Sequence, residues 1–280
     1  MDPMIARRTW RTAEPIHGMI YFSPEATAAY ESLGLTGRMG YFASRAAPMG
    51  AVPPEVVIAT FYNFRPQLVR DAIPEAWTRA TPTAILEARV DSADRALRRS
   101  VPDAIGSADL SEAATLARRA AEVACDHLDG RPLFAGHASL PWPDESHLVL
   151  WHAQSLLREF RGDGHIAALL AAGLSGLEAA ISHVATGEVP GAVMLATRDW
   201  PADEWAAGIE GLQARGILEP GEELALTDTG RSQRQWIEDV TDATSVVAYE
   251  TLGEDGCAQL RTLARPLSKA IVDGGLLRPT

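Results

Sequence analysis

The chain has 280 residues, of which 46% are hydrophobic and 22% charged, so it has the composition of a globular protein with one large core or two smaller ones. No apolar run approaches the roughly 20 residues that cross a bilayer, and the N-terminus lacks the apolar segment of a secretory signal. We therefore expect a cytoplasmic protein with no membrane partner. The net charge of −12 argues against a general affinity for nucleic acid, because the chain would on average repel phosphates.

Helical patterns separated by proline and glycine fill the first two thirds of the chain. His17 lies in an apolar stretch that we expect to be extended, and Ser23 and Pro24 then begin a helix that stops near Gly34. Another helix begins at the Pro-Pro pair in PPEVVIATFYNF, and ASLPWPDESH is a proline-rich connector. Further helices are predicted over residues 67–79, 82–99, 111–128, 148–160, 166–172 and 177–185.

The C-terminal third predicts a different order of elements. VMLATRDW is predicted as a short strand, and the helix after it begins at Pro201. ILEPGEELALT predicts two short strands around a Pro-Gly turn, and a long amphipathic helix follows. This order of helix, strand, helix, hairpin and long helix is that of a winged helix.

Two resemblances follow from these phrases. LQARGILEPGEELALTDTGR resembles the wing of MarR-type regulators, and the last two helices would then resemble the dimerisation arms of that family. EPIHGMIYFSPEA, YFASRAAPMG, ATFYNFRP, LLREFRGDGH and ALTDTGR resemble phrases of a family of actinobacterial helix-turn-helix proteins of about this length. The abundance of alanine and arginine agrees with a GC-rich coding genome. The second resemblance implies a fold and no established activity.

The predicted fold is therefore mainly α, with tandem winged-helix-like, MarR-related lobes. Residues 1–140 form the first, degenerate lobe, and residues 141–280 form the second, which carries a short β-hairpin wing and the terminal helical arms. AWTRATPTAILEARV is weakly similar to AALLAAGLSGLEAAI, which is compatible with two copies of one lobe. Either a monomer with tandem lobes or a homodimer fits this pattern.

The surfaces that a winged helix presents to DNA are acidic in this chain. The predicted recognition helix and wing tip lack the arginine and asparagine contacts that read bases. They carry six carboxylates, namely Asp203, Glu204, Glu210, Glu219, Glu222 and Glu223. We therefore expect no nucleic-acid contact through this helix and wing. A different basic surface remains open, formed by Arg95, Arg98, Arg99, Arg118 and Arg119.

LLREFRGDGHIAALL places charged residues and glycines between two apolar helical runs. In one interpretation it is a helix corner, where Asp163 caps the next helix and neighbouring charges form ion pairs. In the other it is a site. Arg158 would bind an anionic group, and His165 would act as an acid or base that Asp163 or Glu159 orients.

Other polar residues interrupt apolar segments in the first half of the chain. Such groups need hydrogen-bond partners when buried, and a ligand cavity between the lobes would supply them. The predicted catalytic residues are His17, Asp163 and His165. The predicted ligand-binding residues are Tyr21, Arg45, Tyr62, Asn63, Arg158 and Glu159.

No cofactor motif is present in the sequence. Cys125 and Cys257 fit no metal spacing and are expected in the core, while a haem or metal held by His17 and His165 remains open. The sequence favours a small-molecule-binding protein that has lost DNA binding, with enzymatic conversion of a metabolite left undecided. The alternatives are a ligand-responsive MarR-like transcription regulator and a structural dimer module.

Overall fold

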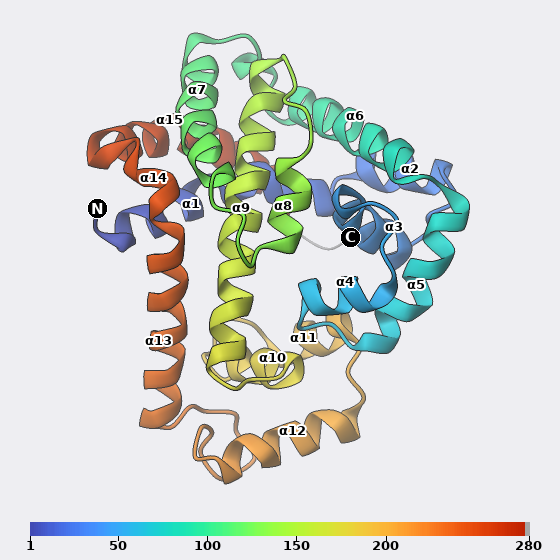
Figure 1. Cartoon of the computed structure of the whole chain (residues 1–280), viewed down its shortest axis with the longest axis vertical. Helices are drawn as coiled ribbons and strands as arrows, with labels where there is room; N and C mark the ends of the chain where they lie inside the picture. Colours follow the sequence, from blue (N-terminus) through green and yellow to red (C-terminus); the bar gives the residue numbers. More distant parts are fainter. Residues whose placement is uncertain (278–280) are drawn as a thin grey trace. The chain divides into compact units, whose positions relative to one another are not determined.

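The computed structural model describes residues 1–277 and consists of helices joined by short loops (Figure 1). The α-helices are α1 (Pro3–Gly18), α2 (Pro24–Ser32), α3 (Arg38–Ala46), α4 (Pro54–Phe61), α5 (Pro66–Arg79), α6 (Pro82–Ser100), α7 (Ala108–Cys125), α8 (Pro132–Ala138), α9 (Ser146–Ala171), α10 (Gly176–Val184), α11 (Gly191–Arg198), α12 (Ala202–Ala214), α13 (Asp228–Ser245), α14 (Val247–Glu250) and α15 (Gly253–Asp273). Short 3₁₀ helices are η1 (Met19–Tyr21), η2 (Ala47–Met49) and η3 (Pro102–Ala104).

The chain forms two compact units, each assembled from segments that are distant in sequence. Unit 1 comprises residues 1–52, 72–164 and 242–280, and unit 2 comprises residues 53–71 and 165–241. The predicted division at residue 140 follows the order of the chain and stays a prediction. Helices α5, α9 and α13 each contribute residues to both units.

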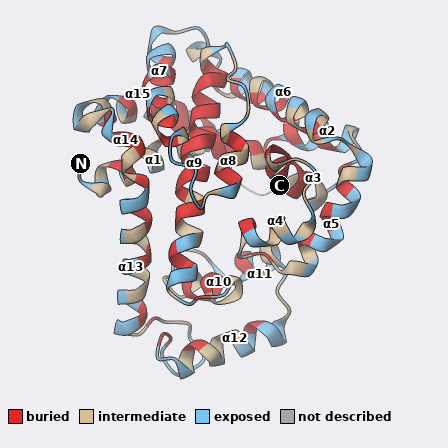
Figure 2. Cartoon of the chain, viewed as in Figure 1, coloured by how far each residue is buried: buried red, intermediate tan, exposed pale blue. Residues whose placement is uncertain are grey.

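Unit 1 has the larger hydrophobic core, and the first two thirds of α9 lie inside it (Figure 2). Leu150, Leu156 and Phe160 of α9 are almost fully buried. Alanines dominate the buried face of α7, which lets neighbouring helices approach closely. Polar side chains of α9 therefore enter an environment with little access to water.

Local sequence explains where several helices begin. Ser23, Thr81 and Ser107 each accept a hydrogen bond from a backbone N–H in the first turn of α2, α6 and α7, respectively. Ser175 and Glu178 form a reciprocal capping box at the start of α10. The helix predicted after Ser23 is confirmed.

A second core holds unit 2 together around α10, α12 and α13. Tyr62 ends α4 with a positive φ of 54°, and its hydroxyl donates a hydrogen bond to the Leu174 carbonyl. A Cβ at Gly176 would lie only 1.9 Å from the Tyr62 carbonyl oxygen. Glycine at the start of α10 thus lets this helix pack directly on the Tyr62 backbone.

The predicted winged-helix fold is wrong, because the described residues contain no sheet and no β-hairpin wing. Between α12 and α13 there is one isolated antiparallel bridge, Leu218 with Leu226. Backbone pairing is limited to Glu219 N–H with Ala225 O (2.9 Å) and Thr227 N–H with Ile217 O (3.1 Å). The rest of the segment between α12 and α13 forms no further bridge.

The ALTDTGR phrase has a structural role of its own. Thr227 accepts a hydrogen bond from Gly230 N–H at 3.0 Å, which caps the start of α13. A Cβ at Gly230 would lie 2.1 Å from the Ile217 carbonyl oxygen. The residues that resemble a wing motif therefore fix a tight junction between the 217–219 segment and α13.

Two further local predictions are also wrong. VMLATRDW lies largely in helix α11 and its C-terminal end, because alanine, leucine and methionine favour helix after Pro190 and Asp199 ends it in the left-handed conformation. His17 belongs to the last turn of α1 and not to an extended segment.

Helix α9 passes through RGDGH without a break, so the predicted corner is wrong. Two glycines in a helix cost about 1 kcal/mol each, but the residues on either side are anchored in hydrophobic cores. Gly164 also permits a close approach, since a Cβ there would lie 2.9 Å from Thr244 Oγ1 of α13. Packing therefore overrides the local tendency of glycine to end a helix.

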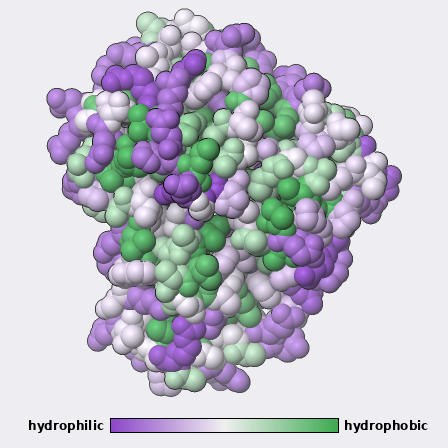
Figure 3. Space-filling model, viewed as in Figure 1, coloured by the Kyte–Doolittle hydropathy of each residue, from purple (hydrophilic) through white to green (hydrophobic). Residues whose placement is uncertain are grey.

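On the face in Figure 3, hydrophobic side chains are interspersed with hydrophilic ones. Within residues 1–277, no single helix is both long and apolar enough to cross a membrane. Only α9 and α10 taken together meet the length and composition, and they are bent by 99° at their junction.

Candidate functional site

A buried chain of hydrogen bonds joins α1, η1 and α9 in unit 1. His17 is fully buried, with Nδ1 2.8 Å from Ser155 Oγ and Nε2 2.9 Å from the Tyr21 hydroxyl. Ser155 donates its only hydroxyl proton to the Trp151 carbonyl at 3.0 Å. Ser155 must then accept from His17 Nδ1–H, which leaves Nε2 to accept from the Tyr21 hydroxyl.

The pKa values of both groups agree with this assignment. Burial lowers the pKa of His17 well below its usual value, with the charge of Glu159 opposing the shift. Burial raises the pKa of Tyr21 to about 12, although Arg45 opposes the shift. At neutral pH, His17 is therefore a neutral imidazole and Tyr21 a neutral phenol whose proton points to His17.

Arg45, Arg158 and Glu159 form an ion cluster beside this chain. Glu159 is 1% exposed. Its Oε2 lies 2.6 Å from Arg158 Nη1, and its Oε1 lies 3.7 Å from Arg45 Nη2. Burial acts to raise the pKa of Glu159, but the two guanidinium groups outweigh it and hold the pKa well below the usual range. Glu159 is thus a permanent anion that neutralises part of its cationic surroundings.

Arg45 also connects the ion cluster with aromatic residues. Its Nη1 donates to the Tyr41 hydroxyl at 2.9 Å, and its guanidinium carbon lies 5.5 Å from the ring centroids of both Tyr21 and Tyr41. Such cation–π contacts fix the orientation of the three side chains.

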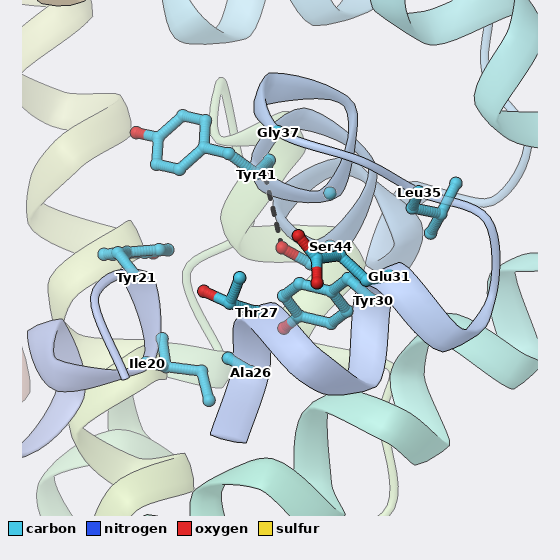
Figure 4. Close-up of a pocket in the computed structure, with 11 residues that line it drawn as sticks. Ile20, Tyr21, Ala26, Thr27, Tyr30, Glu31, Leu35, Gly37, Tyr41 and Ser44 are labelled. Carbon is cyan, nitrogen blue, oxygen red and sulfur yellow. Dashed lines mark hydrogen bonds between the residues drawn. The ribbon is translucent and has the colours of Figure 1, made fainter. Parts of the chain in front are cut away.

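Tyr21 and Tyr41 also line a pocket of unit 1, together with residues from α2 and α3 (Figure 4). Its volume of about 150 Å³ is comparable to cavities that hold a benzene-sized molecule. The rings of Tyr21, Tyr30 and Tyr41 surround it, and Ser44 donates a hydrogen bond to the Tyr41 carbonyl at 3.2 Å. The pocket therefore has aromatic walls, and one of these tyrosines, Tyr21, also belongs to the buried hydrogen-bond chain.

Glu14 lies one turn before His17 in α1. Its Oε2 is buried without a hydrogen-bond partner in the described chain, and burial raises the pKa of its carboxyl group to about 7, although the charge of Arg158 opposes the shift. Arg158 is still 28% exposed. Glu14 is the one acidic group of this cluster that can change its charge near neutral pH.

Asp163 and Arg161 have structural partners in unit 1. Asp163 Oδ2 accepts from Phe134 N–H at 2.9 Å, so it caps α8 and not the continuation of its own helix. Burial raises the pKa of Asp163 to about 6, opposed by this backbone bond. Arg161 Nη1 lies 2.6 Å from Asp242. The predicted ion-pair run therefore ends at Arg158–Glu159.

Three of the predicted site residues belong to unit 2. His165 Nδ1 lies 3.0 Å from Thr241 Oγ1, and Tyr62 bonds to Leu174 as described above. Asn63 accepts from Arg198 Nε at 3.1 Å through its side chain and from Trp200 Nε1 at 3.1 Å through its carbonyl. Unit 1 brings together His17, Tyr21, Arg45, Arg158 and Glu159. The predicted roles of the three unit 2 residues stay predictions.

Sequence reasoning missed four polar residues of unit 1: Glu14, Ser155, Arg89 and His137. Arg89 lies in a run of charges that is typical of a solvated helix face, yet it is 2% exposed. Helical spacing could have found it, because Ile85, Arg89, Ala93 and Ala96 follow one face of α6.

The open possibility of a metal or haem on His17 does not fit the geometry. Both ring nitrogens of His17 are hydrogen-bonded, and Nε2 uses its lone pair for Tyr21. Elsewhere in the described residues, Asp94, Glu145 and His147 place ligand atoms within 4.8 Å of one another. Arg98 already bonds to both carboxylates and supplies the positive charge there.

Comparison with known families gives one match. The model of a helix-turn-helix family matches residues 6–278, so the chain belongs to that family. Comparison with curated proteins and with solved structures finds no match. Family membership defines the class of protein, and the chemistry of the site has to be argued from its own residues.

Proposed function

We propose that the chain is a small-molecule-binding member of its helix-turn-helix family, with the ligand in the pocket that Tyr21 and Tyr41 line. One observation carries this proposal. Tyr21 lines the pocket, and its hydroxyl is bonded to the buried His17–Ser155 chain. A hydroxyl held in this way is pre-organised to meet a ligand without losing further side-chain entropy.

The hydrogen-bond assignment defines what this hydroxyl offers. Its proton is committed to His17, so the oxygen lone pairs are free to accept an N–H or O–H from the ligand. Arg45 fixes the Tyr41 ring while its charge is balanced by Glu159. The aromatic walls would enclose an apolar or aromatic body of the ligand.

The charge of unit 2 supports a ligand other than DNA. Unit 2 carries six arginines, no lysine and fourteen carboxylate side chains. Arg215 is paired with Glu178 at 2.8 Å, and Arg65 with Glu204 at 3.5 Å. The acidic side chains of α12 and of the 219–223 turn are exposed. Phosphates would be repelled by this surface.

Four of the five arginines predicted to form a different basic surface are paired with carboxylates, and the fifth, Arg119, donates to the Thr251 carbonyl at 3.1 Å. On α6, Arg95 pairs with Asp91, Arg98 with Asp94, and Arg99 with Glu25. On α7, Arg118 pairs with Glu122. These cations are already balanced by carboxylates, which supports the loss of DNA binding.

Ligand-observed NMR with a set of benzene-sized fragments that carry one donor group tests the proposed function. We expect some fragments to bind the wild type, and Tyr21→Phe to weaken them by roughly 5- to 10-fold, the usual value of one hydrogen bond. Tyr249→Phe is the matched control, because Tyr249 is a buried tyrosine of unit 1 whose hydroxyl has no partner in the described chain. Equal binding to Tyr21→Phe, or no binding to any variant, would contradict the proposal.

A second candidate is a ligand-responsive transcription regulator, which the family match favours. A gel shift with genomic fragments at about 50 mM and about 200 mM salt tests it, because phosphate contacts weaken steeply with salt. The proposed function predicts no retarded band at either concentration. A sequence-specific retarded band that disappears when a fragment binds the protein would establish the regulator instead.

A further inference from the structure

Arg89 differs from the other arginines of α6. It lies on the face that packs into unit 1, in line with Ile85 and Ala93, and is 2% exposed. Arg95, Arg98 and Arg99 lie on the outer side of the same helix and are paired with carboxylates. A buried arginine is ordinarily found with a counter-ion, since removing its charge from water is strongly unfavourable.

No carboxylate in the described part of the chain forms an ion pair with Arg89. Its Nε and Nη2 are buried and have no hydrogen-bond partner there. One face of the guanidinium lies over the Trp151 ring, with Cζ 5.1 Å from the centroid. This cation–π contact orients the group but leaves its N–H donors, which point outward in the guanidinium plane, unmatched.

Further buried polar groups of α8 and α9 lack hydrogen-bond partners in the described chain and carry no negative charge. Trp151 Nε1 and, one turn further along α9, Gln154 Nε2 are buried without partners. His137 of α8 is 1% exposed, and neither of its ring nitrogens has a partner in the described chain. After burial itself, the charge of Arg89 is the largest influence that lowers the pKa of His137 and of His152. Arg89 therefore lies within electrostatic reach of both imidazoles.

The carboxylates of the neighbouring ion cluster do not neutralise this region. Glu159 has both oxygens directed at Arg158 and Arg45. Arg158, which the sequence suggests as the anion-binding residue, is therefore already paired. Arg89 differs from Arg45 and Arg158 in that no carboxylate of the described residues pairs with it.

We propose that Arg89 is an anion-binding residue, and that it holds a carboxylate, phosphate or sulfate group with the help of the Gln154 amide and the His137 imidazole. Planar carboxylates and tetrahedral oxyanions share the chemistry that a guanidinium fork recognises: a negative charge on two adjacent oxygens.

Thermal unfolding of the full chain with inorganic phosphate, sulfate or benzoate, each at up to about 10 mM and constant ionic strength, tests this inference. We expect a saturable rise in Tm with at least one of them. Benzoate and the tetrahedral anions distinguish a planar from a tetrahedral group. Arg89→Met should abolish the rise, whereas Arg95→Met, an exposed arginine of the same helix, should retain it.

A second variant covers the case in which Arg89→Met does not fold. Arg89→Lys keeps the charge but loses the planar fork, so it should bind the same anion with at least a 5-fold higher Kd by calorimetry. An unchanged Tm of the wild type with all three anions, or an equal response of the Arg89 variants, would overturn the inference. If neutral fragments bind in a Tyr21-dependent manner while the anions have no effect, the Arg89 inference fails and the proposed function stands.

Discussion

Glu14 is the titratable residue of unit 1 through which pH should act on the site. Its pKa is raised to about 7 in the folded chain by burial, whereas a carboxyl group in an unfolded chain has a pKa near 4.3. The folded state therefore holds this proton more tightly than the unfolded state. Its contribution to stability is complete below the unfolded pKa and is lost as the pH rises through about 7.

Replacement of Glu14 by glutamine should remove that dependence. The free energy of unfolding of the wild type, measured relative to Glu14→Gln, is expected to fall between about pH 5 and about pH 8. Urea titrations at several pH values measure it, with Glu122→Gln as the control for loss of a surface carboxylate. A constant difference between wild type and Glu14→Gln over this range would contradict the assignment.

The buried histidines act in the opposite direction. Burial lowers the pKa of both His17 and His137, so the folded chain holds them neutral while the unfolded chain binds protons below about pH 6.5. Their contribution is present at neutral pH and is lost as the pH falls. Glu14 and these two histidines together place the greatest stability of the cluster at mildly acidic to neutral pH.

Helix α9 organises the site, and its two glycines differ in what surrounds them. A Cβ at Gly162 would lie 3.4 Å from the end of the Arg158 side chain, which is close to an ordinary contact. A Cβ at Gly164 would lie 2.9 Å from Thr244 Oγ1, closer than two packed atoms approach. The same substitution should therefore have opposite effects two residues apart.

Gly162→Ala should raise the free energy of unfolding by up to about 1 kcal/mol, the difference in helix propensity. Gly164→Ala should lower it by about 1–3 kcal/mol, because α9 and α13 must move apart. Denaturant unfolding of both variants checks this. Adding Thr244→Ala to Gly164→Ala should recover part of the loss, and similar values for the two alanine variants would argue against the close approach.

The course of α9 also explains why the sequence predicted a helix corner at RGDGH that the structure does not have. Two glycines beside an aspartate favour a helix end in any local comparison. The helix continues because Phe160 on one side and Leu169 on the other are buried in separate cores. Which element Asp163 caps could not be read from its neighbours, since its partner Phe134 lies 29 residues away.

At the scale of the whole chain, the helical content and most helix starts could be predicted from caps and prolines. The absence of a wing could not be predicted, because ILEPGEELALT has the pattern of a hairpin and does lie between α12 and α13, yet it forms only one isolated bridge. Whether such a pattern forms a ladder depends on its tertiary context. The grouping of His17, Tyr21 and Arg45 with Glu159 could be predicted, because these are polar residues that interrupt apolar segments. The burial of Arg89 was not predicted, because the other charged residues near it on α6 are exposed.

The charge distribution links the family to the proposed activity. The helix-turn-helix family match defines the ancestry of the chain, and the excess of carboxylates in unit 2 opposes the electrostatic attraction on which DNA binding depends. Unit 1 instead holds many buried polar groups, and Tyr21 links one hydrogen-bonded set of them to the wall of a pocket. Membership of a helix-turn-helix family is therefore compatible with the small-molecule site that we propose.

A crystal structure of the full chain with the tightest-binding fragment tests the small-molecule site most directly. The predicted result is ligand density in the pocket between Tyr21 and Tyr41, with a donor atom about 2.7–3.2 Å from the Tyr21 hydroxyl oxygen. A fragment that fully occupies another position on the chain, with no density in this pocket, would contradict the proposed site.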